Sequence, residues 1–213
     1  NAYGGDNLIT FGRQLGFALD THFMRCFLSA NPDQQELSLA WRLHILHWAA
    51  RRGLELDGDF VEAACFKGFT ARVIASLTDF ASLARTYWLY DRFSTESDRQ
   101  LMIGHHAGLY EEVVARFSDC PNVRVIQGNI PDVMADHAPE RIAFLHIDIN
   151  SVPAEIGALD VLYDRVSPGG VIVLDDYGWI GKYYPQKAAH DAWFGARGKM
   201  IVELPTGQGL VIK

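Results

Sequence analysis

Two apolar runs that each end in carboxylates constrain the fold of this chain more than any other feature of its sequence. Residues 142–147 (IAFLHI) lead into Asp148, and residues 171–174 (VIVL) lead into the pair Asp175-Asp176. Between the runs, apolar residues recur at helical spacing, and a Pro-Gly-Gly sequence at 168–170 is expected to end that helix. Runs this apolar are typical of parallel strands that are covered on both faces and joined by a crossover helix.

The three carboxylates are expected to meet at one edge of the sheet, because ligands of parallel sheets bind at the carboxyl ends of the strands. Asp148, Asp175 and Asp176 would repel one another unless a cation lay between them. Mg²⁺ prefers oxygen ligands of this kind. An Asp pair after a strand can also simply cap the next turn. The matching position of Asp148 favours a metal or cofactor site.

Composition and charge exclude several classes of function. The chain has 213 residues, 49% of them hydrophobic, which predicts one substantial domain with a small appended segment. A net charge of -7 without a basic stripe argues against nucleic-acid binding. No run has the length of a membrane helix and the start lacks a signal-peptide layout, so we expect a cytoplasmic protein without membrane association. Cys26, Cys65 and Cys120 are unclustered and odd in number, which indicates reduced thiols.

The first 57 residues precede the first clear strand and are treated as an N-terminal helical segment, with 58–213 as the main domain. Helical spacing of apolar residues is found over 15–27 and again over 39–47. Two interpretations stay open for this segment. It is either a pair of helices packed on the sheet edge, or a lid over the active site that contributes to substrate binding.

The stretch at 59–70 has the pattern of a strand, a tight loop and a helix start. Glu62 falls near the carboxyl end of the strand, Gly68 would let the backbone approach a ligand, and Thr70 is a candidate helix N-cap. Only one glycine of a GxGxxG pattern is present, so the loop alone favours an ordinary strand-to-helix turn.

Residues 86–91 form the next expected strand and end at Asp91. An acid in this position holds ribose hydroxyls in nucleotide-binding folds, because a carboxylate accepts both hydroxyl protons. A helix-capping Asp is the alternative. The third strand is expected at 123–127, and Gly128 and Asp132 follow it in a loop at the same edge, where a purine ring could lie.

The end of the chain discriminates between folds. A helix is expected at 187–197, and two strand-like runs at 200–205 and 209–213 are separated by three turn residues, which is a hairpin signal. Five β/α units closed by an antiparallel hairpin are the layout of class I S-adenosylmethionine methyltransferases. We therefore predict a Rossmann-like α/β fold, with a seven-stranded, mostly parallel sheet and helices on both faces.

Three motifs resemble the macrocin O-methyltransferase family. Residues 58–71 (GDFVEAACFKGFTA) are similar to its first motif, and 146–150 (HIDIN) with 162–178 (LYDRVSPGGVIVLDDYG) are similar to its block of strands four and five. The resemblance covers about residues 55–213. It implies a Mg²⁺-dependent O-methyltransferase that uses S-adenosyl-L-methionine to methylate a hydroxyl of a sugar or another small secondary-metabolite or glycan acceptor.

The resemblance also implies site residues. The metal ligands would be Asp148, Asp175 and Asp176. The residues bordering the cofactor would be Glu62, Gly68, Thr70, Asp91, Gly128, Asp132 and Asp148. Two departures from the family pattern stand out: Phe69 replaces a second glycine, and 150–153 replaces an acidic, aromatic segment that faces the substrate. We therefore expect an acceptor different from the family's sugars, or a reduced activity.

Methyl transfer is an in-line displacement, so the enzyme must position an oxygen nucleophile and help to deprotonate it. Chelation of the acceptor by Mg²⁺ would lower the pKa of its hydroxyl. We assign Asp148 and Lys187 to catalysis, with His105, His106 and His146 as alternative bases.

Three other functions remain in competition. They are a metal-independent small-molecule methyltransferase, a catalytically weakened cofactor-binding or scaffold domain, and a nicotinamide oxidoreductase, which the terminal hairpin disfavours. Trp41 and Trp48 would suit the contact of a homodimer.

Overall fold

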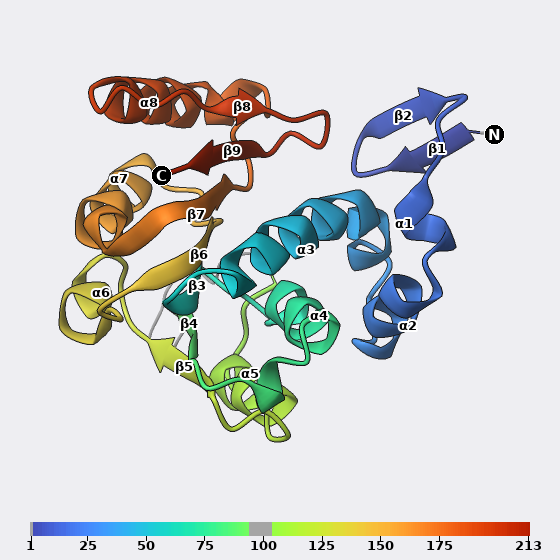
Figure 1. The fold of residues 1–213 in the computed structure, drawn as a ribbon, viewed down its shortest axis with the longest axis horizontal. Coiled ribbons are helices and arrows are strands. Elements are labelled where there is room, and N and C mark those ends of the chain that lie inside the picture. The colour runs from blue at the N-terminus through green and yellow to red at the C-terminus, as the bar shows by residue number, and fades with distance from the viewer. Residues whose placement is uncertain (1, 94–103) are drawn as a thin grey trace.

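The structure is a computed structural model, and it describes residues 2–93 and 104–213. The expectation of a loop or helix start over 92–108 falls largely on 94–103, outside the described residues. In the described part, a seven-stranded sheet with the order β5-β4-β3-β6-β7-β9-β8 forms the centre (Figure 1). Its parallel strands are β3 (Asp59–Ala63), β4 (Tyr87–Asp91), β5 (Val123–Gln127), β6 (Ile142–Ile147) and β7 (Val166–Leu174).

The chain closes the sheet with an antiparallel hairpin. Strand β9 (Gly209–Ile212) pairs with β7 and with the short β8 (Val202–Glu203), both in antiparallel register. The predicted class I methyltransferase architecture is confirmed. Between 104 and 213 the apolar patterns gave the strands in the right order, because strands covered on both faces need long apolar runs. The helix at 132–137 was not predicted.

Helices cover both faces of the sheet (Figure 1). One face packs against α3 (Ala40–Leu54), α4 (Phe69–Leu77) and α5 (Leu109–Arg116). The other packs against α6 (Asp132–His137), α7 (Val152–Leu162) and α8 (Tyr184–Gly195). Alternate side chains of each strand therefore enter two separate cores. Single 3-10 turns are found at η1 (Glu36–Leu39), η2 (Phe80–Ser82), η3 (Tyr163–Arg165) and η4 (Gly181–Tyr183).

The N-terminal segment differs from the two helices expected there. It begins with a hairpin of β1 (Ala2–Gly5) and β2 (Leu8–Phe11), which the sequence did not predict and which is separate from the main sheet. The first helical pattern is divided into α1 (Gly16–Leu19) and α2 (Thr21–Ser29). Asp20 separates them, because its carboxylate accepts hydrogen bonds from the first backbone N–H groups of α2.

Two local predictions were wrong. The Pro-Gly-Gly sequence at 168–170 lies inside β7 and does not end α7, which stops at Leu162. The pairing of β7 with β6 shifts register there, and this irregularity accommodates the proline. In addition, Gly68, with φ +69°, is the N-cap residue of α4, so Thr70 lies inside the first turn.

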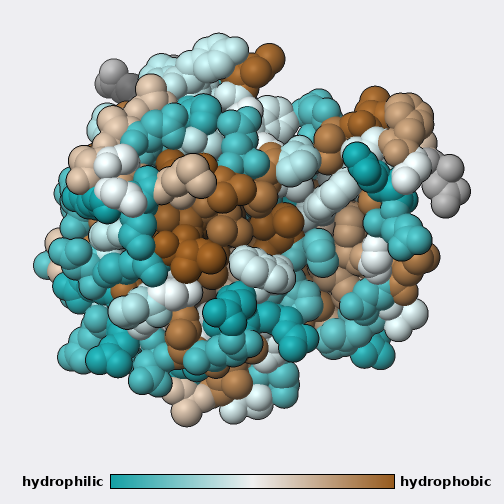
Figure 2. All heavy atoms as spheres, turned by 45° about the horizontal axis from the view of Figure 1, so that its top comes forward, coloured by the Kyte–Doolittle hydropathy of each residue, from teal (hydrophilic) through white to brown (hydrophobic). Residues whose placement is uncertain are grey.

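The surface of the molecule is mostly polar, with apolar side chains gathered on part of one face (Figure 2). Exposed apolar residues beside or on the C-terminal hairpin include Met200, Val202 and Ile212. Over 2–93 and 104–213, no helix is both long and apolar enough to cross a membrane.

Candidate active site

A cavity of about 720 Å³ lies at the carboxyl ends of β3, β6 and β7. One wall is the edge of the sheet, with Glu62, Asp148 and the pair Asp175-Asp176. The loop after β3 and the start of α4 form a second wall. Residues of the N-terminal segment form the third, and they are Asp6, Asn7, Asp33, Gln35, Glu36, Ser38, Leu39 and Arg42. The segment that precedes the first parallel strand therefore helps to enclose the cavity.

The lining of this cavity is strongly acidic. Its carboxylates are those of Asp6, Asp33, Glu36, Glu62, Asp148, Asp175 and Asp176. Its basic side chains are Arg42 and Lys67, and Lys67 is already paired with Asp33 at 2.8 Å. An excess of negative charge in a partly enclosed space attracts cations.

Asp148, Asp175 and Asp176 are brought together as the sequence predicted, because β6 and β7 are neighbours in the sheet. The Asp175 N–H donates to the Ile147 carbonyl at 2.9 Å, so the carboxyl ends of β6 and β7 lie side by side. Burial, and then the charges of Asp175 and Asp176, raise the pKa of Asp148 well above its ordinary value. Burial and the charge of Asp175 raise the pKa of Asp176 to about 6.

Arg42 reaches this cluster from α3. Its Nε lies 2.5 Å from Asp6 Oδ2, and its Nη1 contacts Asp175 Oδ2 and lies 3.3 Å from Asp176 Oδ1. The guanidinium is also 5.3 Å from the centre of the Trp179 ring. Although burial raises the pKa of Asp175, the charge of Arg42 holds it well below its ordinary value.

Sequence reasoning missed Arg42. The available signal was a basic residue flanked by the apolar positions Leu39 and Leu43 of a helical pattern. A charged side chain on a face that packs on a sheet needs a buried partner.

A second layer of polar side chains lies behind Asp175. His146 Nε2 is 3.3 Å from Asp175 Oδ1, and His146 Nδ1 is 3.8 Å from Glu62 Oε2. Although burial lowers the pKa of His146, these two carboxylates raise it to about 10. Glu62 also accepts a hydrogen bond from the Tyr87 hydroxyl at 3.0 Å. The two carboxylates therefore face the buried imidazole from either side and favour its protonated form.

The C-terminal hairpin also supports Asp175. Gln208, which is fully buried, donates from Nε2 to Asp175 Oδ1 at 2.9 Å. The Thr206 hydroxyl donates to Gln208 Oε1 at 2.9 Å and fixes the orientation of the amide. The hairpin that completes the fold thus orients a cavity carboxylate as well.

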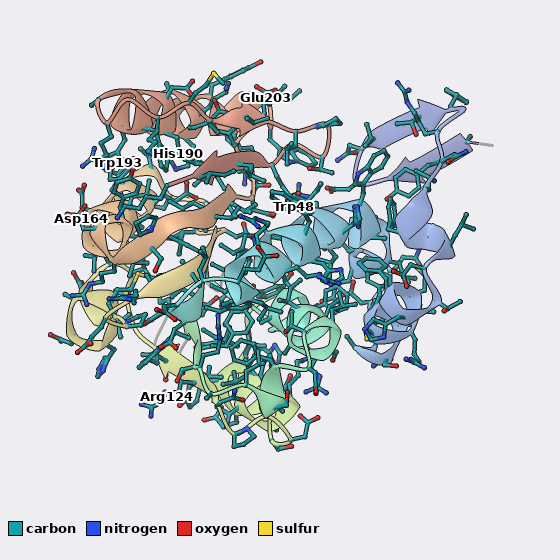
Figure 3. The ribbon with its side chains drawn as sticks, viewed as in Figure 1. Trp48, Arg124, Asp164, His190, Trp193 and Glu203 are labelled. Atoms are coloured by element: carbon teal, nitrogen blue, oxygen red, sulfur yellow. The ribbon has the colours of Figure 1, made fainter. Side chains whose placement is uncertain are left out.

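The loop after β6 is fixed on both sides. Asn150, with φ +61°, donates from Nδ2 to Asp148 Oδ1 at 3.1 Å, and its backbone N–H donates to Glu155 Oε1 at 2.9 Å. The other oxygen of Glu155 lies 2.9 Å from His190 Nε2 of α8 (Figure 3), and both side chains are buried. Asp148 is therefore held by a chain of contacts that reaches α8.

The residues expected to border the cofactor are only partly brought to the cavity. Glu62, Thr70 and Asp148 line it, whereas the other predicted residues, Gly68, Asp91, Gly128 and Asp132, are not part of its lining. Asp91 is buried, and its carboxylate accepts the backbone N–H groups of Phe66 at 2.7 Å and Phe93 at 3.0 Å. Gly128 N–H donates to the Asp91 carbonyl at 3.0 Å, so these two strand ends are adjacent.

None of the four candidate bases lines the cavity. Lys187 Nζ lies 3.3 Å from Glu203 Oε2 (Figure 3) and 3.6 Å from Asp191 Oδ2, outside the cavity. His105 stacks on Phe66, and His106 is exposed and lies 2.9 Å from Glu112 Oε1. The assignment of Lys187 as the base stays a sequence-based prediction, and its ammonium is engaged by two carboxylates elsewhere.

The three carboxylates suit Mg²⁺ in donor type and in charge. Their arrangement is that of a salt-bridge cluster, because Arg42 engages two of them. Within the described ranges 2–93 and 104–213, no three acidic, His or Cys side chains are arranged to hold a metal ion.

Comparison with known proteins identifies the family. The model described as Macrocin-O-methyltransferase (TylF) matches residues 41–191, a range that includes Arg42 and all three cluster aspartates. The chain belongs to the macrocin O-methyltransferase family. A Streptomyces olivaceus protein named 8-demethyl-8-(2,3-dimethoxy-alpha-L-rhamnosyl)-tetracenomycin-C 4'-O-methyltransferase is 28% identical over 171 residues, which is 72% of this chain. The chain spans 63% of the length of that relative.

Solved structures are similar in fold. The O-methyltransferase NovP has a TM-score of 0.63 and 21% identity, covering 81% of this chain and 79% of its own. The apo structure of a TDP-rhamnose 3'-O-methyltransferase of calicheamicin biosynthesis has a TM-score of 0.62 and 15% identity, covering 95% and 96%. At these identities the likeness supports the fold alone.

Proposed function

We propose that this protein is an S-adenosyl-L-methionine-dependent O-methyltransferase acting on a hydroxyl of a sugar or another small secondary-metabolite or glycan acceptor, with Mg²⁺ as its metal. The observation that carries the proposal is the acidic cavity at the carboxyl ends of β3, β6 and β7, in a chain of the macrocin O-methyltransferase family. Its three buried free cysteines suit the reducing cytoplasm, where we place the reaction.

The cofactor fits the charge of the cavity. S-adenosyl-L-methionine carries a sulfonium and an ammonium group, and the carboxylates of Glu62 and Asp148 would attract both. The ribose would lie near Asp91, whose carboxylate keeps free lone pairs after accepting two backbone N–H groups. Gly68, Thr70, Gly128 and Asp132 complete the proposed cofactor border around that position.

The acceptor would lie between the cofactor and the N-terminal wall. Asn7, Gln35 and Ser38 offer amide and hydroxyl groups that suit the hydroxyls of a sugar. The N-terminal segment 1–57 would thus act as the lid and substrate segment, over the methyltransferase domain 58–213. Exclusion of water by this wall would strengthen every electrostatic contact of the reacting groups.

Asp148, Asp175 and Asp176 would hold Mg²⁺. When bound, the ion would supply a Lewis acid that lowers the pKa of the acceptor hydroxyl. The chain's own residues prepare these ligands: Gln208 orients Asp175, and Asn150 orients Asp148. The reaction needs little more than positioning, because methyl transfer is a single in-line displacement.

The test uses the purified chain in two steps. Calorimetric titration with S-adenosylhomocysteine should give saturable binding. Labelled cofactor is then offered with a panel of glycosides and catechols, with and without EDTA. We expect methylation of a glycoside hydroxyl that EDTA stops and Mg²⁺ restores. Absence of S-adenosylhomocysteine binding would support the scaffold alternative and refute the proposal.

A second candidate function is a metal-independent small-molecule methyltransferase. The specific observation in its favour is Arg42, which already provides a cation for Asp175 and Asp176. Equal turnover with and without EDTA, once an acceptor is known, would establish this alternative.

We also propose a homodimer. Trp48 is 46% exposed on α3 (Figure 3), whereas Trp41 packs inside the segment against Tyr3. Large exposed aromatic side chains are typical of interfaces. Light scattering on the wild type and on Trp48→Glu should show loss of the dimer in the variant. A wild-type monomer would contradict the proposal.

A further inference from the structure

A second cavity, of about 370 Å³, lies in the N-terminal segment between α3 and the helices α1 and α2. Figure 1 shows these two short helices beside the start of α3. The lining of this N-terminal pocket shares no residue with that of the active-site cavity. The proposed reaction therefore uses none of its side chains.

Helix α3 lines the pocket with the face that points away from the sheet. The opposite face, with Leu43 and Leu46, is buried in the core. An amphipathic helix usually carries charged side chains on its outer face, whereas this one carries mostly rings there. The residues of the outer face that line the pocket recur at helical spacing and are Trp41, His44, His47, Trp48 and Arg51.

Flat ring faces form the apolar part of the pocket. Phe17 of α1 stacks on His44, with 5.2 Å between the ring centroids, and lies 5.6 Å from Trp41. Phe23 of α2 stacks on His47 at 6.3 Å. The face of an aromatic ring is electron-rich, so it attracts the weakly positive C–H groups of a ligand.

The two histidines add neutral polar groups to these rings. Burial lowers the pKa of His44, and burial together with the charge of Arg51 lowers the pKa of His47 to about 4. At neutral pH each imidazole therefore offers one donor and one acceptor. Within residues 2–93 and 104–213, neither ring forms a hydrogen bond, so both remain available to a ligand.

The pocket also has one carboxylate and one guanidinium that do not pair with each other. Asp20 accepts the N–H groups of His22 at 2.9 Å and Phe23 at 3.0 Å through Oδ1 alone, which leaves Oδ2 available. Arg51 has no ion-pair partner in the described part of the chain. The pocket thus offers an acceptor, a donor and two groups that are both.

We propose that the N-terminal pocket is a carbohydrate-binding site that is separate from the active site. A sugar hydroxyl can donate to Asp20 and another can accept from Arg51, while the C–H face of the ring lies on the aromatic side chains. A purely apolar ligand would leave both charged groups without partners, at a cost in free energy. The cavity has the volume of about twelve waters at roughly 30 Å³ each, which suits one sugar ring.

The test locates binding on the wild-type chain by NMR of ¹⁵N-labelled histidine side chains. The probes are methyl glycosides of a hexose and of a 6-deoxyhexose, at a protein concentration at which light scattering shows a single species. The ring signals of His44 and His47, assigned with His44→Phe and His47→Phe, should shift saturably, and that of His190 should not. Absence of these shifts at the highest soluble concentration of both probes would overturn the inference.

Two variants then test the charged groups. Asp20→Asn removes the charge and keeps a good N-cap for α2, and Arg51→Met keeps most of the apolar stem. Each should weaken sugar binding about tenfold, because a hydrogen bond to a charged group is lost. The matched control is Arg52→Met, since Arg52 pairs with Glu55 outside the pocket and its loss should leave the affinity unchanged. Unchanged affinity in both Asp20→Asn and Arg51→Met would contradict the proposed site.

Parallel measurements separate this inference from the proposed reaction. Shifts of His44 and His47 with 2-naphthol but with neither glycoside would show an aromatic-binding pocket and refute the carbohydrate site. S-adenosylhomocysteine binding without the sugar-dependent shifts would overturn this inference alone. The shifts in a chain that does not bind S-adenosylhomocysteine would support the sugar site and refute only the proposed reaction.

Discussion

The carboxylates that end β4 and β7 look alike in the sequence and differ in the structure. Asp91 ends β4, and two backbone N–H groups of nearby loops bond to its oxygens. Asp175 and Asp176 follow β7, and their partners are side chains from distant elements, including Arg42 of α3. An acid after a buried strand is thus a loop anchor in one place and part of a charged cavity in the other.

The difference lies in what surrounds each carboxylate. Backbone donors are fixed by the chain and cannot leave, so Asp91 is part of the architecture even if it also binds the cofactor. Side-chain donors can turn away on their own rotatable bonds, although breaking a buried ion pair costs free energy. The cluster after β7 is therefore the part of the sheet edge where we expect the chemistry, and four experiments test this contrast.

The largest effect is expected for Asp176→Asn on turnover. The variant should fold, because it removes one of several crowded negative charges, and its turnover should fall roughly 1,000-fold, or about 4 kcal/mol of transition-state stabilisation. The measurement is a single-turnover assay with the identified acceptor. Asp164→Asn, a change of an exposed carboxylate, is the control (Figure 3). Undiminished turnover in Asp176→Asn would remove Asp176 from the mechanism.

Asp91→Ala should act on both stability and cofactor binding. Two backbone N–H groups lose a charged acceptor, which should cost about 3 kcal/mol in the free energy of unfolding, and S-adenosylhomocysteine should bind more weakly. Chemical denaturation and calorimetry measure the two effects.

Asp59→Ala is the matched control for Asp91→Ala. Asp59 also accepts two hydrogen bonds, from Thr86 N–H and Trp88 Nε1, both at 2.8 Å. It is the first residue of β3, so it lies at the edge of the sheet opposite to the cavity. The Asp59→Ala variant should have a lower free energy of unfolding than the wild type and an unchanged affinity for S-adenosylhomocysteine. Unchanged cofactor affinity in a folded Asp91→Ala variant would show that Asp91 only anchors the loops and does not bind the cofactor.

The pH dependence of stability should expose the crowding after β7. The raised pKa of Asp176, about 6, means that the folded chain binds more protons than the unfolded chain between about pH 4 and 6. This contribution is fully present below that window and is lost as pH rises through about 6. Without metal, the unfolding free energy of the wild type relative to Asp176→Asn should gain about 1.5 kcal/mol from about pH 7.5 to about pH 5.

The quantity to measure is the difference in unfolding free energy between the wild type and Asp176→Asn at each pH. His47, whose pKa burial lowers to about 4, destabilises both proteins alike as the pH falls. Saturating Mg²⁺ should abolish the gain, because the bound ion favours the ionised carboxylate. A pH-independent difference would contradict the assigned crowding of Asp176.

The smallest effect is expected for Thr206→Val. It removes the hydroxyl that orients Gln208, which in turn donates to Asp175. Stability should fall by about 1 kcal/mol, and Mn²⁺ affinity should fall severalfold because a supporting contact of a ligand is lost. Thermal melts and Mn²⁺ titration measure both. A change in stability without any change in metal affinity would show that the C-terminal hairpin does not support metal binding.

The order of the main-sheet strands and the edge on which the site lies could be predicted from the sequence. Apolar runs such as 142–147 must be covered on both faces, and the acids that directly follow them must then stand at the strand ends. Asp148, Asp175 and Asp176 were predicted to meet for this reason, and they do. These inferences need only local periodicity and the geometry of parallel sheets.

The partners of these acids, in contrast, depend on how the elements pack together. Arg42 and Asp175 are 133 positions apart, and no local pattern connects them. They meet because α3 packs across β6 and β7, and because the free energy of burying an arginine requires that carboxylates be near it. The N-terminal hairpin and the two backbone bonds to Asp91 were decided in the same way. Sequence periodicity reports which face of an element is buried, whereas the partners of buried charges depend on which elements pack together.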